Sequence, residues 1–395
     1  MTALSCLFYP YFSGLSRQEK RRPGMDGQQE KAVHAREIYE YLSGKDGVAQ
    51  QELTAALHLS MPTVLQSLKA LRAQGLIRDD ATFASTGGRK ARQLRLIPDA
   101  RIAIGLEITA HHLNLTAIDL LGHILHTRRI RHPYADSYYY YATLGRLLSH
   151  FLEEPRLAGK PILGVGLALA AIIEEDQKTI RSARLLGAPK NLCEKLAPHI
   201  SLPFALFNDA KSGGYAEWWN MGEAGRTILY LSLSNSLGGA MIDHHSLYMG
   251  DRGKSCEFGH MTLVPGGKPC YCGKAGCANA YLHADLLSNL AEGSMEDFFE
   301  AVEKHDAVCE AALDEYLRYL AILVNNLHMM YDCDIVLGGY AGPYLRPYMD
   351  EFREMVRRPD RLRNEPDYVT ICRHRYNAAA VGAALHFADR FVQSL

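Results

Sequence analysis

The apolar residues of the first hundred positions recur at helical spacing in three stretches, residues 29–42, 47–59 and 60–77. The third stretch opens with Ser60, a good helix N-cap, and Gly75 is a natural point for the helix to end. A short turn separates the second and third helices, and this arrangement predicts a helix-turn-helix. We expect the core-facing stripe of the third helix to consist of Val64, Leu65, Leu68 and Leu71.

Polar side chains occupy the expected outer face of the third helix, and two strand-like pieces follow it around TGGRKAR, residues 86–92. These pieces predict a β-wing with a basic tip. Side chains of these types hydrogen-bond base edges or phosphates. The expected DNA contacts are Thr63, Gln66, Ser67, Lys69 and Arg72 on the helix, and Arg89, Lys90 and Arg92 on the wing.

Positive charge is concentrated in this part of the chain. The whole protein has a formal net charge of −1, whereas residues 1–100 contain 14 Lys and Arg against 10 Asp and Glu. A local positive charge suits the phosphate backbone of DNA. Small three-helix units also serve as protein-interaction modules, and that alternative stays open. The helix pattern, the wing and the charge together favour DNA binding.

After Pro98 the pattern changes to alternating strand-like and helix-like stretches, and a second set of the same kind opens at residue 227. Two similar α/β halves predict two lobes with a cleft between them, where small ligands bind. In the first set we expect three strands within residues 100–130, a helix at 138–154, a strand at 162–170, a helix near 190–199, a strand at 204–209 and a helix at 210–221.

The composition is that of a globular protein, with 395 residues, of which 48% are hydrophobic and 22% charged. The longest apolar run, residues 161–173, is too short for a membrane helix and is expected to contain a buried strand. Nine cysteines, several of them isolated, suit reduced thiols in the cytoplasm better than a disulfide framework. Residues 1–28 are expected to form a loose tail, with Met25 as an alternative start.

One histidine and three cysteines lie close together within residues 256–277, CEFGHMTLVPGGKPCYCGKAGC. One imidazole and three thiolates make a tetrahedral zinc set without an open position, which indicates a structural metal. The prolines and glycines supply the loop that such closely spaced ligands need. Unligated cysteines on a loop are the alternative. The predicted ligands, separated by nine, one and four residues, are His260, Cys270, Cys272 and Cys277.

The order of these features, with FND, CEFGH and CYCGKAGC following a winged helix, resembles the ROK family of sugar kinases and sugar-responsive repressors. The resemblance is to the form with an N-terminal DNA-binding domain, and it covers residues 30–395. It implies an actin-like (ribonuclease H-like) α/β fold of two lobes, a zinc site and a sugar pocket. The implied domains are a winged helix-turn-helix at 29–98 and a kinase-like domain at 99–395, with lobe one at about 99–220 plus the C-terminal helix and lobe two at about 221–375.

The resemblance also implies a set of sugar-binding residues. In the family, the loop before the zinc histidine supplies a glutamate and that histidine to sugar hydroxyls, here Glu257 and His260. The zinc would then fix the backbone that aims them. Asn208 and Asp209 offer an amide and a carboxylate to vicinal hydroxyls, and Asp209 matches the general base of the kinases. A solvated carboxylate for Glu257 and a helix cap for the Asn-Asp pair are the alternatives.

The sequence departs from the family's kinases at the nucleotide elements. The phosphate loop, Asp-x-Gly-Gly-Thr in the kinases, reads Glu-Ile-Thr-Ala-His at 107–111, and the second glycine-rich loop is half eroded at 234–240. Side chains thus stand where backbone must approach a triphosphate. The third loop keeps a glycine pair in LGGYAG at 337–342. Near the sugar, Asn279 stands where the family often has a glutamate, which leaves the identity of the ligand open.

These observations predict a DNA-binding transcriptional regulator of carbohydrate metabolism, a repressor rather than an enzyme. Paired operator half-sites call for a homodimer or homotetramer, and a sugar or sugar derivative in the cleft would change the angle between the lobes. One alternative is an ATP-dependent sugar kinase with Asp209 as general base. Another is a regulator that has lost its sugar and answers to a protein partner.

Overall fold

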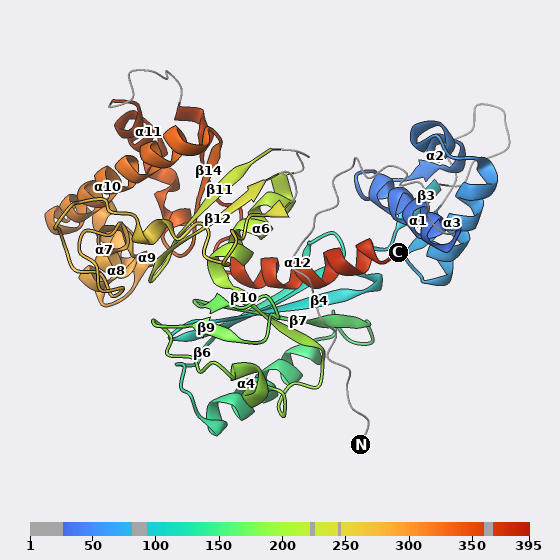
Figure 1. Ribbon diagram of the computed structural model, residues 1–395, viewed down its shortest axis with the longest axis horizontal. Coiled ribbons are helices and arrows are strands. Elements are labelled where there is room, and N and C mark those ends of the chain that lie inside the picture. Colours follow the sequence, from blue (N-terminus) through green and yellow to red (C-terminus); the bar gives the residue numbers. More distant parts are fainter. Residues whose placement is uncertain (1–26, 81–92, 222–225, 244–245, 359–365) are drawn as a thin grey trace.

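A small helical head and two larger α/β lobes make up the protein in the computed structural model (Figure 1). Helix α12 (Ala378–Gln393) packs on the sheet of the first lobe, and helix α6 (Asp209–Met221) packs on the sheet of the second. The two helices also pack against each other, so they form the layers between the sheets. The structure describes residues 27–80, 93–221, 226–243, 246–358 and 366–395.

The head has the expected order of elements. Its strands form an antiparallel sheet in the order β1-β3-β2 against the three helices. Ser60 caps the third helix, since its Oγ accepts a hydrogen bond from the N–H of Thr63 at 3.3 Å. The elements are α1 (Gly27–Ser43), β1 (Val48–Ala49), α2 (Gln50–Leu57), α3 (Met61–Ala73), β2 (Ile77–Asp80) and β3 (Gln93–Leu96).

Two positions of α3 differ from the sequence prediction. Leu65 is 45% exposed and Ser67 is 4% exposed, so the expected places of these two residues are wrong. The buried face follows the i, i+3, i+4, i+7 spacing of a helix and consists of Val64, Ser67, Leu68 and Leu71. The tail up to residue 26 and the predicted wing contacts lie outside the described residues, namely Arg89, Lys90 and Arg92.

The first lobe is a five-stranded sheet in the order β10-β7-β4-β5-β6. Strand β4 pairs antiparallel with β5 and parallel with β7, and the three expected strands within residues 100–130 are present. Helix α12 lies very close to the sheet, because a Cβ at Gly105 would fall 1.7 Å from the carbonyl oxygen of Ala380. The elements are β4 (Ile102–Ile108), β5 (His112–Asp119), β6 (Ile124–Arg131), α4 (Tyr138–Leu152), β7 (Ile162–Leu169), β8 (Ile172–Ile173), β9 (Ile180–Ser182), α5 (Leu192–Leu196) and β10 (Phe204–Asn208).

The second lobe repeats this topology, with a five-stranded sheet in the order β13-β12-β11-β14-β15. In both lobes the third, second, first, fourth and fifth strands along the chain lie side by side, which is the duplication expected of an actin-like fold. The elements are β11 (Ile228–Leu233), β12 (Leu237–Asp243), β13 (Ser246–Leu247), α7 (Asn279–Leu282), α8 (Asp285–Ser288), α9 (Met295–Glu303), α10 (Ala307–Tyr331), β14 (Asp334–Gly338), α11 (Met349–Arg357) and β15 (Val369–Ile371). The described residues also contain five 3-10 turns, at Pro98–Ala100, Phe258–His260, Asn289–Ala291, Gly342–Tyr348 and Pro366–Tyr368.

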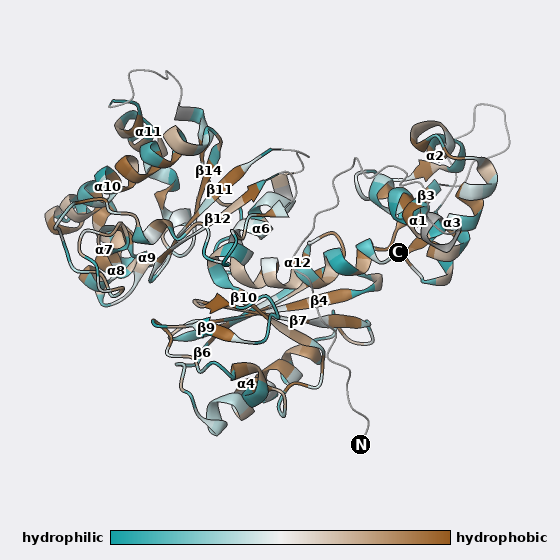
Figure 2. Ribbon diagram, in the orientation of Figure 1, coloured by the Kyte–Doolittle hydropathy of each residue, from teal (hydrophilic) through white to brown (hydrophobic). Residues whose placement is uncertain are grey.

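The head shares its hydrophobic core with the helices between the lobes. Figure 2 shows apolar residues along β4 and β7 beneath α12. Buried Ile38 and Leu68 of the head belong to the same cluster as Tyr215 of α6 and Leu385 of α12. The head is therefore packed on the body rather than tethered to it. Across the described ranges, no helix combines the length and the apolar character needed to cross a bilayer.

Candidate functional site: an interlobe pocket beside a cysteine-histidine cluster

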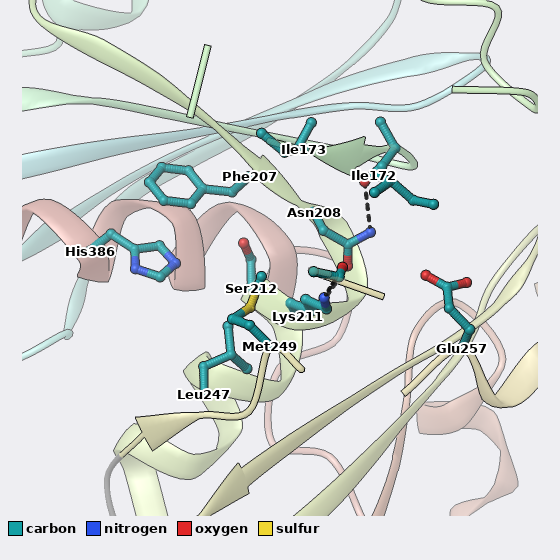
Figure 3. Close-up of a pocket in the computed structure, with 12 residues that line it drawn as sticks. Ile172, Ile173, Phe207, Asn208, Lys211, Ser212, Leu247, Met249, Glu257 and His386 are labelled. Atoms are coloured by element: carbon teal, nitrogen blue, oxygen red, sulfur yellow. Dashed lines mark hydrogen bonds between the residues drawn. The ribbon is translucent and has the colours of Figure 1, made fainter. Parts of the chain in front are cut away.

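A pocket lies between the lobes where β10 ends and α6 begins (Figure 3). Its interior has room for a volume of about 20 Å³, which is roughly one water molecule. A sugar therefore enters only if the lobes move apart. The polar side chains of its wall are Asn208, Lys211, Ser212, Glu257 and His386.

The Asn208–Asp209 pair stands at the start of α6, as the sequence predicts. Asn208 caps the helix, because its Oδ1 accepts the N–H of Lys211 at 2.9 Å, and its Nδ2 donates to the carbonyl of Ala171 at 3.0 Å. Oδ1 of Asp209 accepts the N–H of Ala210 at 2.8 Å. The cap interpretation therefore holds for Asn208. A sugar contact by either residue stays a prediction and is compatible with the cap.

Three carboxyl groups surround this point, and burial raises the pKa of each. The pKa of Asp209 is about 6, since burial outweighs the hydrogen bonds from backbone N–H groups. Glu107, at the place of the kinase phosphate loop, has a pKa of about 7, although Asn114 Nδ2 donates to it at 2.6 Å. Glu257 lies at the solvent-exposed mouth of the cleft, where surrounding protein still desolvates it enough to raise its pKa. Burial therefore favours the protonated form of all three carboxyl groups.

Lys211 was missed in the sequence, because a lysine on a helix is usually solvent-exposed. Its side chain is buried, and Nζ donates to the carbonyl oxygen of Gly253 at 2.9 Å. Lys211 lies in the first turn of α6, the helix that packs on the sheet of lobe two, so this hydrogen bond holds residue 253 against the start of α6 at the pocket. The available signal was its position in NDAK, one helical turn after Asn208.

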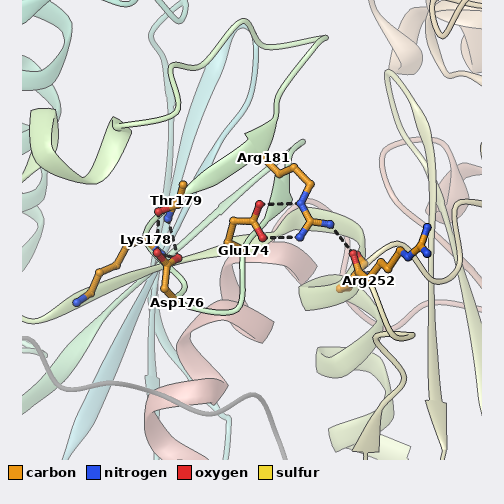
Figure 4. A network of polar contacts seen from close by, with 8 residues as sticks. Glu174, Asp176, Lys178, Thr179, Arg181 and Arg252 are labelled. Carbon is orange, nitrogen blue, oxygen red and sulfur yellow. Dashed lines mark hydrogen bonds and ion pairs between the residues drawn. The ribbon is translucent and has the colours of Figure 1, made fainter.

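A second cation, this one from lobe one, reaches the same segment of lobe two. Arg181, on the hairpin formed by β8 and β9, donates to the carbonyl of Arg252 at 2.6 Å and forms a bidentate ion pair with Glu174 (Figure 4). The hairpin is itself stiffened by Asp176, whose carboxylate accepts from Thr179 at 2.6 Å. The segment of residues 250–253 is thus held by two basic side chains, Lys211 of α6 and Arg181 of lobe one.

The cysteine-histidine cluster is assembled as the spacing predicts, and it can hold a metal ion. The four ligand atoms all lie within 4.8 Å of one another, and Cys272 Sγ lies 3.7 Å from Cys277 Sγ. The loop needs glycine at residue 276, where φ is +80° and a Cβ would fall 1.7 Å from the carbonyl oxygen of Val264. The ligands brought together are His260, Cys270, Cys272 and Cys277.

The two ring nitrogens of His260 face different partners. Nδ1 lies 3.7 Å from the sulfur of Cys270, inside the cluster, whereas Nε2 lies 3.2 Å from the hydroxyl of Tyr271. The sequence did not indicate this role for Tyr271, because a residue between two closely spaced ligands is usually taken only to separate them. A sugar contact by His260, which stays a prediction, would have to share Nε2 with this tyrosine.

Backbone groups of the third glycine loop already have acceptors within the protein. In the family's kinases such loops hold phosphate through free N–H groups. Here three successive N–H groups are engaged: Gly339 donates to the Tyr230 hydroxyl at 2.9 Å, Tyr340 to Ser234 Oγ at 3.2 Å, and Ala341 to the Leu233 carbonyl at 2.8 Å.

A cation–π contact lies next to the third glycine loop. The guanidinium of Arg129, from lobe one, lies 5.0 Å from the ring centre of Tyr376, in the segment before α12, and 5.6 Å from that of Tyr340 in lobe two. This cation–π contact bridges the lobes. Asn279 is 5% exposed, and its Oδ1 accepts the N–H of Leu237 at 2.8 Å. It holds the eroded second loop, and its predicted sugar contact stays a prediction.

The side chains of α3 that were predicted to contact DNA differ in their exposure and in the contacts they already make within the protein. Gln66 and Lys69 are exposed. Thr63 is half-buried, with its hydroxyl 2.8 Å from that of Ser60. Arg72 forms an ion pair with Asp79 at 2.8 Å, so it braces the wing. A DNA contact by Gln66 and Lys69 stays a prediction, and their exposure is compatible with it.

Comparisons with known proteins agree with this architecture. Residues 103–390 match the sequence profile of the ROK family, and residues 34–78 match that of winged helix-turn-helix DNA-binding domains. The xylose repressor of Bacillus subtilis (strain 168) is 24% identical over 304 residues, which cover 75% of this chain and 79% of the repressor.

Two solved structures share the fold. A ROK family transcriptional regulator, a homologue of the E. coli MLC protein, superimposes with a TM-score of 0.73 at 17% identity, over 93% of this chain and 98% of that one. A ROK family glucokinase from Streptomyces griseus, solved with glucose and AMPPNP, gives a TM-score of 0.59 at 22% identity, over 72% and 98%. The expected actin-like fold is thereby confirmed. Because the ROK match spans well over half of the sequence, the chain belongs to the ROK family.

Proposed function

We propose that this protein is a transcriptional repressor of carbohydrate metabolism whose affinity for operator DNA is set by a sugar or sugar derivative in the interlobe pocket. The shared core carries the proposal. The apolar core of the head continues between α6 and α12, and the same two helices contribute Ser212 and His386 to the pocket. A ligand that moves these helices relative to each other therefore acts on the head directly.

A chain of contacts supports this coupling. The ring of His386, which burial keeps neutral by lowering its pKa to about 3, stacks on Tyr215 at 5.1 Å between ring centres. The Tyr215 hydroxyl donates to Asp389 Oδ2 at 3.2 Å. The charges of Glu40 and Arg36, on α1 of the head, act on Asp389. Stacking and a hydrogen bond thus lead from the pocket to Asp389, and charge–charge interaction leads from Asp389 to α1 of the head.

Regulation rather than phosphate transfer is favoured on the nucleotide side. The backbone N–H groups of Gly339, Tyr340 and Ala341 donate to acceptors within the protein. The guanidinium of Arg129 lies over the rings of Tyr340 and Tyr376. The alternative, an ATP-dependent sugar kinase, draws on Asp209, whose raised pKa would suit a general base. For that alternative, ATP binding would have to break both the cation–π contact of Arg129 and the hydrogen bonds of the N–H groups at residues 339–341.

A structural zinc ion suits the cysteine-histidine cluster. Tetrahedral bonds of about 2.3 Å to sulfur and about 2.0 Å to nitrogen place ligand atoms roughly 3.5–3.8 Å apart, and the Cys272–Cys277 and Cys270–His260 separations are both 3.7 Å. Such an ion would stiffen the loop that carries Glu257 into the cleft.

Operator binding by a single recognition helix is weak, so we propose a homodimer or homotetramer reading paired half-sites. The domain limits at residues 28/29 and 98/99 belong to the same proposal. Gln66 and Lys69 of each head would reach the bases and phosphates.

The test is a titration of the purified full chain with fragments of its host's chromosome, followed by addition of a panel of sugars. Fluorescence anisotropy measures operator Kd with and without each sugar. We expect one sugar class to weaken binding at least fivefold, in line with couplings of about 1–3 kcal/mol. ATP-dependent phosphorylation of a sugar that is abolished by Asp209→Asn would replace the proposal with the kinase alternative.

A further inference from the structure

A lysine is buried in the wall of the proposed effector pocket. Lys211 is 6% exposed, and of its three N–H donors the described residues give a partner to one, through the Gly253 carbonyl at 2.9 Å. Burial lowers its pKa, while the charges of Cys256 and Glu257 oppose that shift. A buried ammonium group normally has a contact ion partner. Within the described ranges, no ion pair joins this ammonium group to a carboxylate, and its hydrogen-bond acceptor is the Gly253 carbonyl.

A second donor beside Lys211 also lacks an acceptor. Ser212 is 1% exposed, and its Oγ has no hydrogen-bond partner among the described residues, although it lines the pocket. Glu257 stands on the other side of the pocket, at the solvent-exposed mouth (Figure 3). The inner wall of the pocket therefore offers donors, whereas the acceptors stand at the mouth and at the start of α6.

The remaining wall is apolar. Ile172 and Ile173 of lobe one and Leu247 and Met249 of lobe two line the pocket around the two donors. Such a wall repels water from an ammonium and a hydroxyl, which strengthens their hydrogen bonds to a charged acceptor. It offers nothing to a second ammonium, so an amino sugar is disfavoured at this wall.

We propose that the effector is an acidic sugar, a monosaccharide that carries a carboxylate, and that Lys211 selects it. The carboxylate accepts hydrogen bonds from Lys211 Nζ and Ser212 Oγ, while Asn208, Asp209 and Glu257 face its hydroxyls. This inference rests on the proposed function of the pocket. It also gives the ligand a way to act, because the carboxylate replaces the Gly253 carbonyl as acceptor and so releases one of the two contacts on residues 250–253.

The experiment compares matched pairs of sugars that differ in the carboxylate alone, glucuronate with glucose and galacturonate with galactose. Binding to the full chain is measured by isothermal titration calorimetry and by thermal shift. A hydrogen bond to a charged group is worth enough to make the acid of one pair bind about tenfold tighter or more than its neutral partner. Lys211→Gln should abolish that preference. Lys211→Arg should retain part of it, because the charge remains.

Lys254→Gln is the matched control, since Lys254 is an exposed lysine that directly follows residues 250–253. It should keep the preference for the acid. The inference is overturned if neutral sugars bind as tightly as the acids, if no acid binds, or if Lys211→Gln and Lys254→Gln lower the preference equally. The comparison of sugar pairs on the unmodified protein decides the matter even if Lys211→Gln does not fold.

The failure of this inference differs from the failure of the proposed function. If neutral sugars alone release the operator, Lys211 does not select the ligand and the repressor stands. If operator binding ignores both members of every pair and all other sugars, the sugar-responsive function itself falls.

Discussion

Tyr215→Phe tests the proposed route from pocket to head. The substitution deletes the hydroxyl that lies 3.2 Å from Asp389 Oδ2 and keeps the ring that stacks on His386. Asp389, with a pKa of about 6, is mostly ionised at pH 7.5, and Gln393 Nε2 remains its donor at 2.8 Å. A hydrogen bond to a charged group is worth about 1.5–3 kcal/mol, and the remaining donor offsets part of the loss. We expect the free energy of unfolding to fall by about 1–2 kcal/mol.

The same loss should appear in regulation. If the hydroxyl transmits ligand binding to the head, the ratio of operator Kd with and without effector should shrink by up to about five- to thirtyfold, the equivalent of 1–2 kcal/mol. Operator Kd is measured by fluorescence anisotropy, and stability by urea unfolding. Tyr316→Phe is the matched control, since Tyr316 is 2% exposed and donates to the Leu282 carbonyl at 3.0 Å within lobe two.

The two variants separate stability from coupling. Both should lose stability, and only Tyr215→Phe should lose the response to effector. A Tyr215→Phe protein with the full wild-type ratio, or a Tyr316→Phe protein with an equally reduced one, would refute the route through Tyr215 and Asp389.

Three further predictions concern other parts of the molecule. Glu107 has a folded pKa of about 7 against an ordinary 4.5, so the folded state binds this proton more tightly; stability should fall by up to about 3 kcal/mol as pH rises from about 4.5 through 7. Glu107→Gln should flatten that decline in urea unfolding at pH 5 and pH 8, and an unchanged slope would assign it to other groups. Cys277→Ser, at a fully buried cluster position, should lose bound zinc by elemental analysis and about 2 kcal/mol or more of stability; a native protein without zinc would contradict this. Lys69→Ala should weaken operator binding and reduce the slope of log K against log salt by about one, whereas Lys178→Ala, on the distant hairpin, should leave both unchanged.

The spacing of hydrophobic residues along the sequence predicted most of the fold, because it matches the strands and helices that the structure contains. The three strands within residues 100–130 and the helix that begins after Asn208 lie where expected. In α3, the prediction placed Leu65 on the buried face and Ser67 on the exposed face, because it gave more weight to hydrophobicity than to helical spacing. Leu65 is more apolar than Ser67, yet only residue 67 falls on the i, i+3, i+4, i+7 face that begins at Val64.

The candidate site was predictable where ligands are close in sequence, and not where they are distant. The four cluster residues fall within eighteen positions, so their spacing was sufficient. Lys211 and Gly253 are 42 positions apart, and Tyr215 and Asp389 are 174 apart. Burial of a lysine also runs against its usual preference for solvent. Such pairs become visible only when the sheets, α6 and α12 have been placed.

The packing of the head against α12 constrains how the gene can be engineered. Phe391, Val392 and Leu395, at and just after the end of α12, belong to the apolar cluster that also contains the buried residues of the head. Trimming the C-terminus, or fusing a bulky tag to it, would strip apolar cover from a region more than three hundred positions upstream. A chimera that carries the DNA-binding domain of another protein should likewise lose this packing, unless the C-terminal residues of that protein are introduced together with the domain.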